Sequence, residues 1–287
     1  MLRFQLIPSL VVLTLHAMKS LKLFLPLFVL VVISQCTNPP KENKAKTPRT
    51  LLAIFAHPDD EATVSQVLAK YAAEGVTVYL AIATDGRLGT TAHAKIPAGD
   101  SLASVRAEEL KCAAEKLGIE PPIMFGLHDQ LKMGEGYGPV HDQLNTLRVK
   151  VKELFTTLKP DVVVTWGPSG WTGHHDHRLV NAVVTEVFQS QAWEKPSQLF
   201  YSAIPTGNIA ADGPMQLATV DSIFLSVKIP LSEKDFEISK ASWLCHKSQY
   251  TPETIEAMHQ MIKASYKGHA YFQPLVANGK KQGSLFE

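Results

Sequence analysis

Apolar runs of strand length alternate with amphipathic stretches of helix length between residues 51 and 191 of this chain. The apolar runs carry few polar residues on either face, a pattern typical of parallel strands that are covered by helices on both sides. We therefore predict an α/β fold with a doubly wound, mostly parallel sheet and helices on both of its faces. The expected strands are residues 51–56, 76–84, 122–126 and 161–166, and the expected helices are residues 62–75, 102–118, 140–159 and 176–191.

The C-terminal third of the chain is less regular. Residues 199–204 and 222–230 favour two more strands, and helical patterns follow around residues 234–247 and 252–264. No internal repeat or low-complexity segment interrupts the pattern. A single catalytic domain over residues 50–287 is the simplest prediction.

Residues 1–36 have the features of a bacterial export signal. The run from Leu21 to Ile33 is almost entirely apolar, with the length of a signal-peptide core, and is short for a membrane-spanning helix. Lysines near its start make Met18 a candidate translation start, and the segment that ends at Cys36 resembles a lipobox, in which the cysteine is lipidated. We expect an extracytoplasmic protein that is anchored to the membrane through Cys36, with residues 37–49 as a flexible linker. Ordinary secretion, an uncleaved anchor and a cytoplasmic protein are the alternatives.

Charge and cysteine content narrow the possible partners. The sequence has 28 basic and 27 acidic residues, a formal net charge of +1, and no basic run able to follow a phosphate backbone, so we expect no nucleic-acid partner. The sequence carries no signal for an oligomeric state. Apart from Cys36, the cysteines are Cys112 and Cys245, which we expect to be small buried residues, with a disulfide between them in an oxidising compartment as the alternative.

Polar residues gather where the first four predicted strands end. The carboxyl ends of parallel strands meet at one edge of the sheet, where ligands bind in open α/β folds. We therefore expect the four clusters to line one site. In chain order they are His57–Glu61, Thr84–Gly86, His128–Asp129 and Gly173–Arg178.

The last of these clusters is typical of a metal site. His174 and His177 are three residues apart, so both can face the same side of a helical turn. Asp176 can orient one imidazole, and we assign it to His174. Two histidines and one aspartate would bind a divalent metal and leave a position for water, as metal-assisted hydrolysis requires.

Two of the clusters together resemble a known family. Residues 56–61 read AHPDDE, and residues 173–178 read GHHDHR, which fits a G-H-x-D-H pattern. This pair of motifs resembles the zinc de-N-acetylases of the PIG-L/LmbE-like family. The resemblance extends from Leu51 to Gln249 and includes the R-x-x-E stretch from Arg106 to Glu109 and the HKSQ stretch that ends at Gln249.

The resemblance implies a Rossmann-like fold, one zinc ion per chain, and removal of the acetyl group from an N-acetylated amino sugar of the N-acetylglucosamine type. It implies that His57, Asp60 and His177 bind the zinc and that Asp59 is the general base. His174 would either stabilise the oxyanion or protonate the departing amine.

The resemblance also implies contacts with the sugar. Arg106 and Asp129 match positions that contact the sugar in the family, with a helix-surface ion pair for Arg106 and a turn cap for Asp129 as the alternatives. This chain has Arg87 where the family often has Glu, and His175 where the family commonly has Pro. Because Arg87 would lie at the rim of the pocket, we include it among the expected substrate contacts and leave the identity of the sugar open.

The candidate residues account for amide hydrolysis without reference to the family. Zinc can lower the pKa of a bound water to about 7 and polarise a carbonyl oxygen. Asp59 would take a proton from the attacking water, with Glu61 as its support. The alternatives are an amidase of the same mechanism that acts on another N-acyl group or a thiol conjugate, a non-catalytic sugar-binding lipoprotein, and a non-haem iron oxygenase, whose metal is also held by two histidines and a carboxylate.

Overall fold

The computed structural model describes residues 48–209, 216–277 and 279–287. The predicted export signal over residues 1–36, with its lipobox-like cysteine, lies outside these residues, as does most of the predicted linker. Within the described part of the chain, no helix is both long enough and apolar enough to span a membrane.

A seven-stranded sheet forms the centre of the domain, with strand order β3-β2-β1-β4-β5-β7-β6. Strands β1 to β5 are parallel, and β7 pairs antiparallel with both β5 and β6. The predicted α/β fold with a mostly parallel sheet is therefore confirmed. The strands are β1 Thr50–Phe55, β2 Thr77–Thr84, β3 Ile123–Leu127, β4 Val162–Trp166, β5 Gln198–Ala203, β6 Val227–Pro230 and β7 His269–Pro274.

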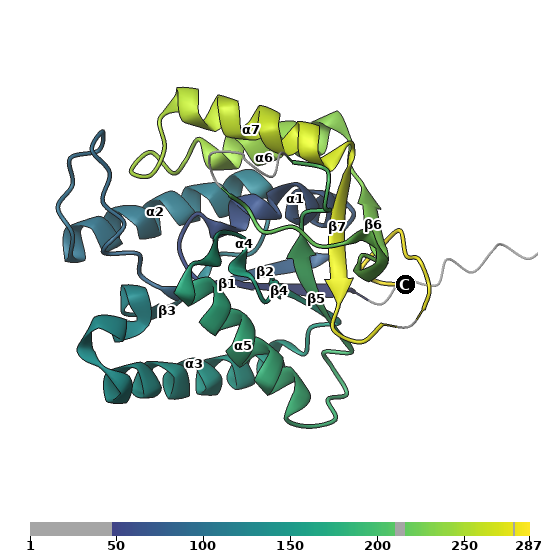
Figure 1. Ribbon diagram of the computed structural model, residues 1–287, viewed down its shortest axis with the longest axis horizontal. Helices are drawn as coiled ribbons and strands as arrows, with labels where there is room; N and C mark the ends of the chain where they lie inside the picture. Colours follow the sequence, from purple (N-terminus) through teal and green to yellow (C-terminus); the bar gives the residue numbers. More distant parts are fainter. Residues whose placement is uncertain (1–47, 210–215, 278) are drawn as a thin grey trace, which may run out of the picture. The chain divides into compact units, whose positions relative to one another are not determined.

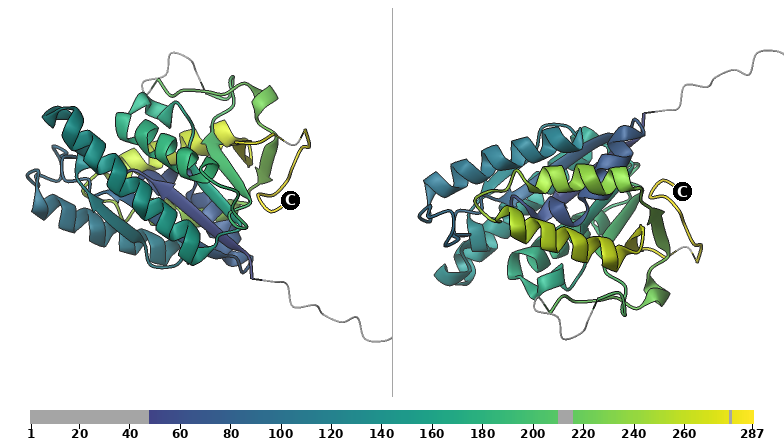
Figure 2. Two further views of the ribbon diagram at one scale, coloured as in Figure 1. Left: turned by 90° about the horizontal axis from the view of Figure 1, so that it is seen from below. Right: turned by 90° about the horizontal axis from the view of Figure 1, so that it is seen from above.

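Helices cover both faces of this sheet, as Figures 1 and 2 show. Alternate residues of β1 point to opposite faces, and each set joins its own buried apolar cluster, one with α1, α2, α6 and α7 and the other with α3 and α5. This two-sided burial explains why the parallel strands are apolar on both faces. The helices are α1 Ser65–Ala73, α2 Asp100–Leu117, α3 Tyr137–Leu158, α4 Gly170–Gly173, α5 His175–Gln189, α6 Glu233–Trp243 and α7 Pro252–Tyr266, with short 3₁₀ segments η1 Asp60–Thr63, η2 Asp129–Glu135 and η3 Ser222–Phe224.

The C-terminal third differs from the prediction in two places. Residues 222–224 form η3, and the strand predicted over 222–230 begins only at Val227. Strand β7 was not predicted, because its sequence HAYFQP buries only Ala270 and Phe272 and lacks the continuous apolar run of the central strands. Strand β7 lies near the edge of the sheet, where one-sided burial suffices.

Cys112 and Cys245 form a disulfide, so the favoured expectation of two unpaired residues was wrong and the alternative of a disulfide holds. Helices α2 and α6 pack side by side, which brings the two Cα atoms to 5.8 Å from each other, within the range that a disulfide bridges. The two residues are 133 positions apart in the sequence, and only the packing of the two helices brings them together.

The chain order of the sheet places a switch point between β1 and β4. From β1 the chain moves outward through β2 to β3, and it then returns to place β4 on the other side of β1. Loops that leave neighbouring strands in opposite directions open a crevice at the carboxyl ends of those strands. The polar clusters after β1 and β4 lie at this crevice.

Candidate active site

The loop after β1 carries three acidic residues, and each has a different set of contacts. Asp60 Oδ2 accepts hydrogen bonds from the backbone amides of Ala56 and His57, at 2.9 and 2.8 Å. Asp59 has a φ of 114° and ψ of −16°, a left-handed conformation that is costly for a residue with a side chain. Its backbone amide donates to Glu61 Oε2 at 3.0 Å, and Glu61 is itself fully buried against His246 Nε2 at 2.6 Å. Glu61 therefore supports the unusual backbone of Asp59.

The segment between β4 and α5 places His177. Its imidazole stacks on Trp166 at the end of β4, with ring centroids 4.1 Å apart and an interplanar angle of 8°. The ring Nδ1 lies 2.9 Å from the carbonyl oxygen of Gly170. Gly170 has a φ of 64°, and a Cβ at this position would lie 2.7 Å from the Cβ of His177. Only glycine therefore allows the chain to pass this close to the imidazole.

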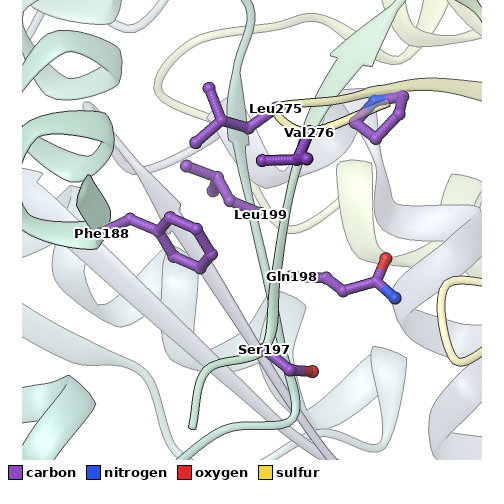
Figure 3. Close-up of a pocket in the computed structure, with 7 residues that line it drawn as sticks. Phe188, Ser197, Gln198, Leu199, Leu275 and Val276 are labelled. Carbon is purple, nitrogen blue, oxygen red and sulfur yellow. The ribbon is translucent and has the colours of Figure 1, made fainter. Parts of the chain in front are cut away.

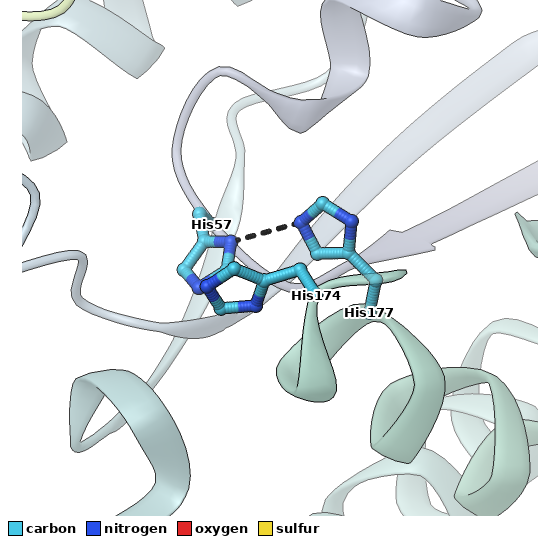
Figure 4. A group of neighbouring side chains, drawn as sticks. All are labelled: His57, His174 and His177. Atoms are coloured by element: carbon cyan, nitrogen blue, oxygen red, sulfur yellow. Dashed lines mark hydrogen bonds between the residues drawn. The ribbon is translucent and has the colours of Figure 1, made fainter. Parts of the chain in front are cut away.

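Figure 4 shows that the imidazole of His57, from the loop after β1, and those of His174 and His177, from the start of α5, converge. His57 Nδ1 lies 3.3 Å from His177 Nε2, and the donor atoms of the three rings lie within 4.8 Å of one another. Asp60 joins them, since its Oδ1 is 3.3 Å from His177 Nε2 and its Oδ2 is 3.5 Å from His57 Nδ1. The structure therefore brings together His57, Asp60 and His177, the three predicted metal ligands.

The outer nitrogens of the two imidazoles have partners that fix the tautomers. His177 Nδ1 can only donate to the Gly170 carbonyl, which leaves a lone pair on Nε2. His57 Nε2 lies 3.0 Å from Asp176 Oδ2 and 3.3 Å from Asp129 Oδ1, so it carries the proton and leaves a lone pair on Nδ1. Both lone pairs face the carboxylate of Asp60. Neutral imidazoles with carboxylate or carbonyl partners are the usual arrangement around zinc.

The carboxylate of Asp176 therefore orients His57, and the assignment of Asp176 to His174 was wrong. The first turn of α5 points this side chain into the protein, where its Oδ2 also accepts from the backbone amide of Gln130 at 2.9 Å. His174 is held instead by the backbone of Asp176, whose amide donates to His174 Nδ1 at 3.2 Å. The N-cap position of His174 explains this contact, because the cap side chain accepts from the first turn of the helix.

The electrostatics of the cluster favour positive charge. Burial opposes a charge on His57, but the surrounding carboxylates outweigh burial and raise its pKa well above the ordinary value. Burial also opposes the charge of Asp60, but His177 and His57 hold the pKa of Asp60 well below its usual range. A site that stabilises protons on its imidazoles also stabilises a divalent cation in their place, so the residues present fit a bound metal ion.

Asp59 lies next to this donor set but has other partners. Its Oδ1 accepts from Arg106 Nη2 at 2.9 Å, and its Oδ2 accepts from the hydroxyl of Tyr250 at 2.9 Å. Burial raises the pKa of Asp59, and the neighbouring Asp60 adds to this rise against the opposing charge of Arg106. Asp59 is thus a positioned carboxylate with increased basicity, as a general base requires.

The three residues expected to contact a sugar have different positions. Arg106 is only 3% exposed and donates to Asp59 and to the backbone oxygens of Gly86 and Pro58, so it is not a surface ion pair. Asp129 lies behind His57, and contacts with His57 and with backbone amides lower its pKa to about 2 although burial opposes this. Both residues also reach the cavity wall.

Arg87 is the residue that the structure does not bring to the site. Its guanidinium pairs with Asp85 at 2.7 Å and with Asp100 at 3.1 Å, and it is absent from the described residues that line the cavity. The Arg87 guanidinium lies between Asp85 and Asp100, and these two ion pairs turn the side chain away from the cavity. Its predicted contact with the substrate stays a prediction.

A cavity of about 350 Å³ opens over the cluster. Its walls are mostly polar, and the residues that line it are His57, Asp59, Asp60, Leu88, Gly89, Arg106, Asp129, Gln130, His174, His177 and Tyr250. A different cavity of about 200 Å³, shown in Figure 3, lies where β5 begins, between Phe188, Leu199 and Leu275. None of the residues that line this second cavity is charged, a histidine or a cysteine, so it offers no comparable chemistry.

Sequence reasoning missed three contributors. Tyr250 is the residue directly after the HKSQ stretch, and its aromatic hydroxyl was a signal that could have extended the motif by one position. His246 is inside that stretch and holds Glu61. Gln130 takes part through its backbone amide, in a left-handed turn with φ of 60°, which no side-chain pattern reveals.

Comparison with known proteins agrees with this geometry. A family model for PIG-L, described as GlcNAc-PI de-N-acetylase, matches residues 52–188. This match identifies residues 52–188, a little under half of the chain, as similar to the PIG-L family. The His/Asp cluster described above lies within the matched residues.

Individual relatives extend this result. A 1D-myo-inositol 2-acetamido-2-deoxy-alpha-D-glucopyranoside deacetylase from Mycobacteroides abscessus is 31% identical over 175 residues, which cover 56% of this chain and 62% of the relative. Three curated relatives carry this same name, and this chain spans 62%, 66% and 61% of their lengths.

Two solved structures share the fold. An N,N'-diacetylchitobiose deacetylase from Pyrococcus horikoshii has a TM-score of 0.58 and 17% identity, with 80% of this chain and 85% of that chain covered. GalB, the 4-carboxy-2-hydroxymuconate hydratase from Pseudomonas putida, has a TM-score of 0.58 and 16% identity, with 80% and 97% covered. The two proteins are named for different reactions, so the fold by itself does not set the chemistry.

Proposed function

We propose that this chain is a zinc-dependent hydrolase that removes the acetyl group from an N-acetylated amino sugar of the N-acetylglucosamine type. The observation that carries the proposal is the position of Asp59. It is a buried carboxylate held by Arg106 and Tyr250, and it lines the same cavity as the donor atoms of His57, Asp60 and His177. A binding protein would have no need of a base beside a metal site.

The residues divide the work of hydrolysis between them. Zinc, when held by His57, Asp60 and His177, would acidify water and polarise the carbonyl oxygen of the amide. Asp59 takes a proton from water as the water oxygen forms a bond to the carbonyl carbon. Arg106 and Tyr250 keep both oxygens of Asp59 in position, and each oxygen retains a free lone pair for this proton.

His174 faces the same cavity and can stabilise the carbonyl oxygen as it gains charge. Its Nδ1 accepts a hydrogen bond from the Asp176 amide, so the proton of the neutral ring is on Nε2. One such donor contributes about 3 kcal/mol to the transition state. The C–N bond then breaks, the nitrogen takes the proton, and the products are acetate and the free amine. We expect Asp59 to return that proton, since it received it from water.

The names of related proteins support the class of substrate. The Mycobacteroides relative is named for a 2-acetamido-2-deoxy-glucopyranoside, and the Pyrococcus enzyme is named for diacetylchitobiose, so both names describe 2-acetamido sugars. The polar wall of the cavity in this chain, which includes Asp129, Gln130 and Gly89, suits sugar hydroxyls.

Incubation of the zinc-loaded protein with a panel of N-acetylated mono- and oligosaccharides, with acetate and free amine as readouts, tests the proposal. Asp59→Asn is expected to retain zinc and to lose turnover by a factor of about 10² or more. Asp142→Asn is the matched control, because Asp142 is exposed on α3. Release of acetate at equal rates by wild type and Asp59→Asn would contradict the assignment of the base.

We also propose that the protein works outside the cytoplasm, held by a lipid on Cys36. The support is the lipobox-like sequence together with the disulfide between Cys112 and Cys245, since disulfides persist mainly in oxidising compartments. Fractionation of cells fed labelled fatty acid tests this location. Label on the wild type and none on Cys36→Ala is the expected result, and unlabelled cytoplasmic protein in both strains would contradict it.

A further inference from the structure

An apolar cavity of about 240 Å³, distinct from the one at the start of β5, adjoins the candidate active site. Asp59, Asp60, His177 and Tyr250 line both this cavity and the polar one, so the catalytic groups lie at the junction of the two. The remaining wall is almost entirely apolar. Its largest contributors are Trp166, Trp171, Trp243, Met258, Met261 and Ile262.

Most of the few polar side-chain groups on this wall are already engaged, and the exception among the described residues is the indole N–H of Trp166, which has no hydrogen-bond partner. The Trp171 indole donates to the Ser202 carbonyl at 3.1 Å, and the Trp243 indole donates to the Ala62 carbonyl at 3.1 Å. The hydroxyl of Thr63 donates to the Asp60 carbonyl at 2.9 Å. A sugar hydroxyl would find few partners here and would pay the cost of desolvation, whereas a hydrocarbon chain would not.

The polar cavity and the apolar cavity suit the two groups that the amide bond of the substrate joins. The amine side of the substrate is the sugar, with hydroxyl groups that need hydrogen bonds, and the acyl side is a hydrocarbon. If the sugar occupies the polar cavity, the acyl group must extend from the scissile carbon into the apolar one. We propose that the apolar cavity binds an acyl chain longer than acetyl, so that the substrates are N-acyl amino sugars with acyl chains of several carbons. This inference rests on the proposed amide hydrolysis.

The size of the cavity supports this assignment. An apolar protein cavity of about 150 Å³ is large enough to hold benzene, so a methyl group would leave most of the 240 Å³ unfilled. An acetyl group would cover only a small part of this apolar wall and would therefore gain only a small part of the free energy available from burying it.

The wall combines a rigid side and an adaptable side. Trp171 has a φ of 60° and ψ of −62°, a rarely populated conformation, and its ring contacts Trp166 edge-on with centroids 5.9 Å apart. Met258 and Met261 on α7 line the same cavity and are half-buried, and methionine adapts to irregular apolar ligands. Substitutions on the α7 side can therefore change the volume without disturbing the ligands of the metal.

The first test compares N-acetyl-, N-butyryl-, N-hexanoyl- and N-octanoylglucosamine as substrates of the zinc-loaded full chain. We expect kcat/KM to rise about fourfold for each added methylene, equivalent to about 0.8 kcal/mol, until the cavity is filled. Hydrolysis of the acetyl compound with no gain for any longer chain would overturn the acyl-chain proposal and leave the deacetylase function intact.

The second test uses Met261→Trp, which fills the cavity, with Val149→Trp as the control, because Val149 is 65% exposed on α3. The ratio of kcat/KM for the hexanoyl and acetyl compounds is expected to fall at least tenfold in Met261→Trp and to stay at the wild-type value in the control. An unchanged ratio in Met261→Trp, with the variant folded by circular dichroism, would overturn the assignment of the cavity.

Measurements of ligand binding test the acyl-chain proposal independently of the proposed hydrolysis. If no compound in the panel is hydrolysed, the proposed function fails, and calorimetric titration with the same four amides then tests the cavity by itself. Affinity that rises with chain length in wild type, and less so in Met261→Trp, supports an acyl-binding cavity. Equal affinity for all four amides overturns it.

Discussion

Removal of the disulfide between Cys112 and Cys245 should destabilise the domain by a calculable amount. The bridge closes a loop across 133 positions, and the chain-entropy relation for a loop of that size gives about 5 kcal/mol at 25 °C. Measured losses for native disulfides are more often 2–4 kcal/mol. For a domain of this size, a loss of about 3 kcal/mol corresponds to a decrease in Tm of roughly 6–12 °C.

Thermal unfolding of wild type, Cys112→Ala, Cys245→Ala and the double variant measures this loss. Because either single substitution breaks the same bridge, the three variants should unfold within about 2 °C of one another, and reductant should lower the Tm of wild type toward theirs. A wild type that unfolds at the same temperature with and without reductant, and together with the variants, would refute the reasoning.

Three further predictions concern the site. His177→Ala should abolish stoichiometric zinc binding, because it removes Nε2 from the donor set, and metal analysis of the purified variant checks this; full zinc retention would contradict the ligand assignment. Asp176→Asn should weaken zinc affinity by roughly 10–100-fold through loss of the contact with His57 Nε2, as measured by competition with a chelator, whereas Asp142→Asn should bind zinc as wild type does. Tyr250→Phe should reduce kcat about tenfold with zinc content unchanged, because Asp59 loses one of its two holding contacts, and an unchanged kcat would show that Arg106 alone suffices.

The central fold was predictable because its signals are local. Each parallel strand is buried on both faces, so a continuous apolar run marks it, and each following helix has its own periodicity. Strand β7 lacks this signal, since its burial depends on a neighbour that the sequence does not identify.

The site was predictable as a set of residues and less so as a set of contacts. Topology alone brings the segments after β1 and β4 together, and this is why His57, Asp60 and His177 converge as expected. Sequence spacing shows which residues share a helical turn, but it does not show which residue of another segment lies next to them. The pairing of Asp176 with His57 therefore became visible only in three dimensions.

The left-handed backbone of Asp59 restricts how this site can change in evolution. Asp, Asn and Gly are the residues that adopt this conformation most readily, and other side chains would cost roughly 1–2 kcal/mol. A lineage that lost catalysis but kept the fold would therefore accumulate Asn or Gly at position 59 far more readily than Ala or Val. Among homologous sequences, Asn or Gly directly after the His-Pro pair would mark proteins that still bind metal and sugar but have lost the base.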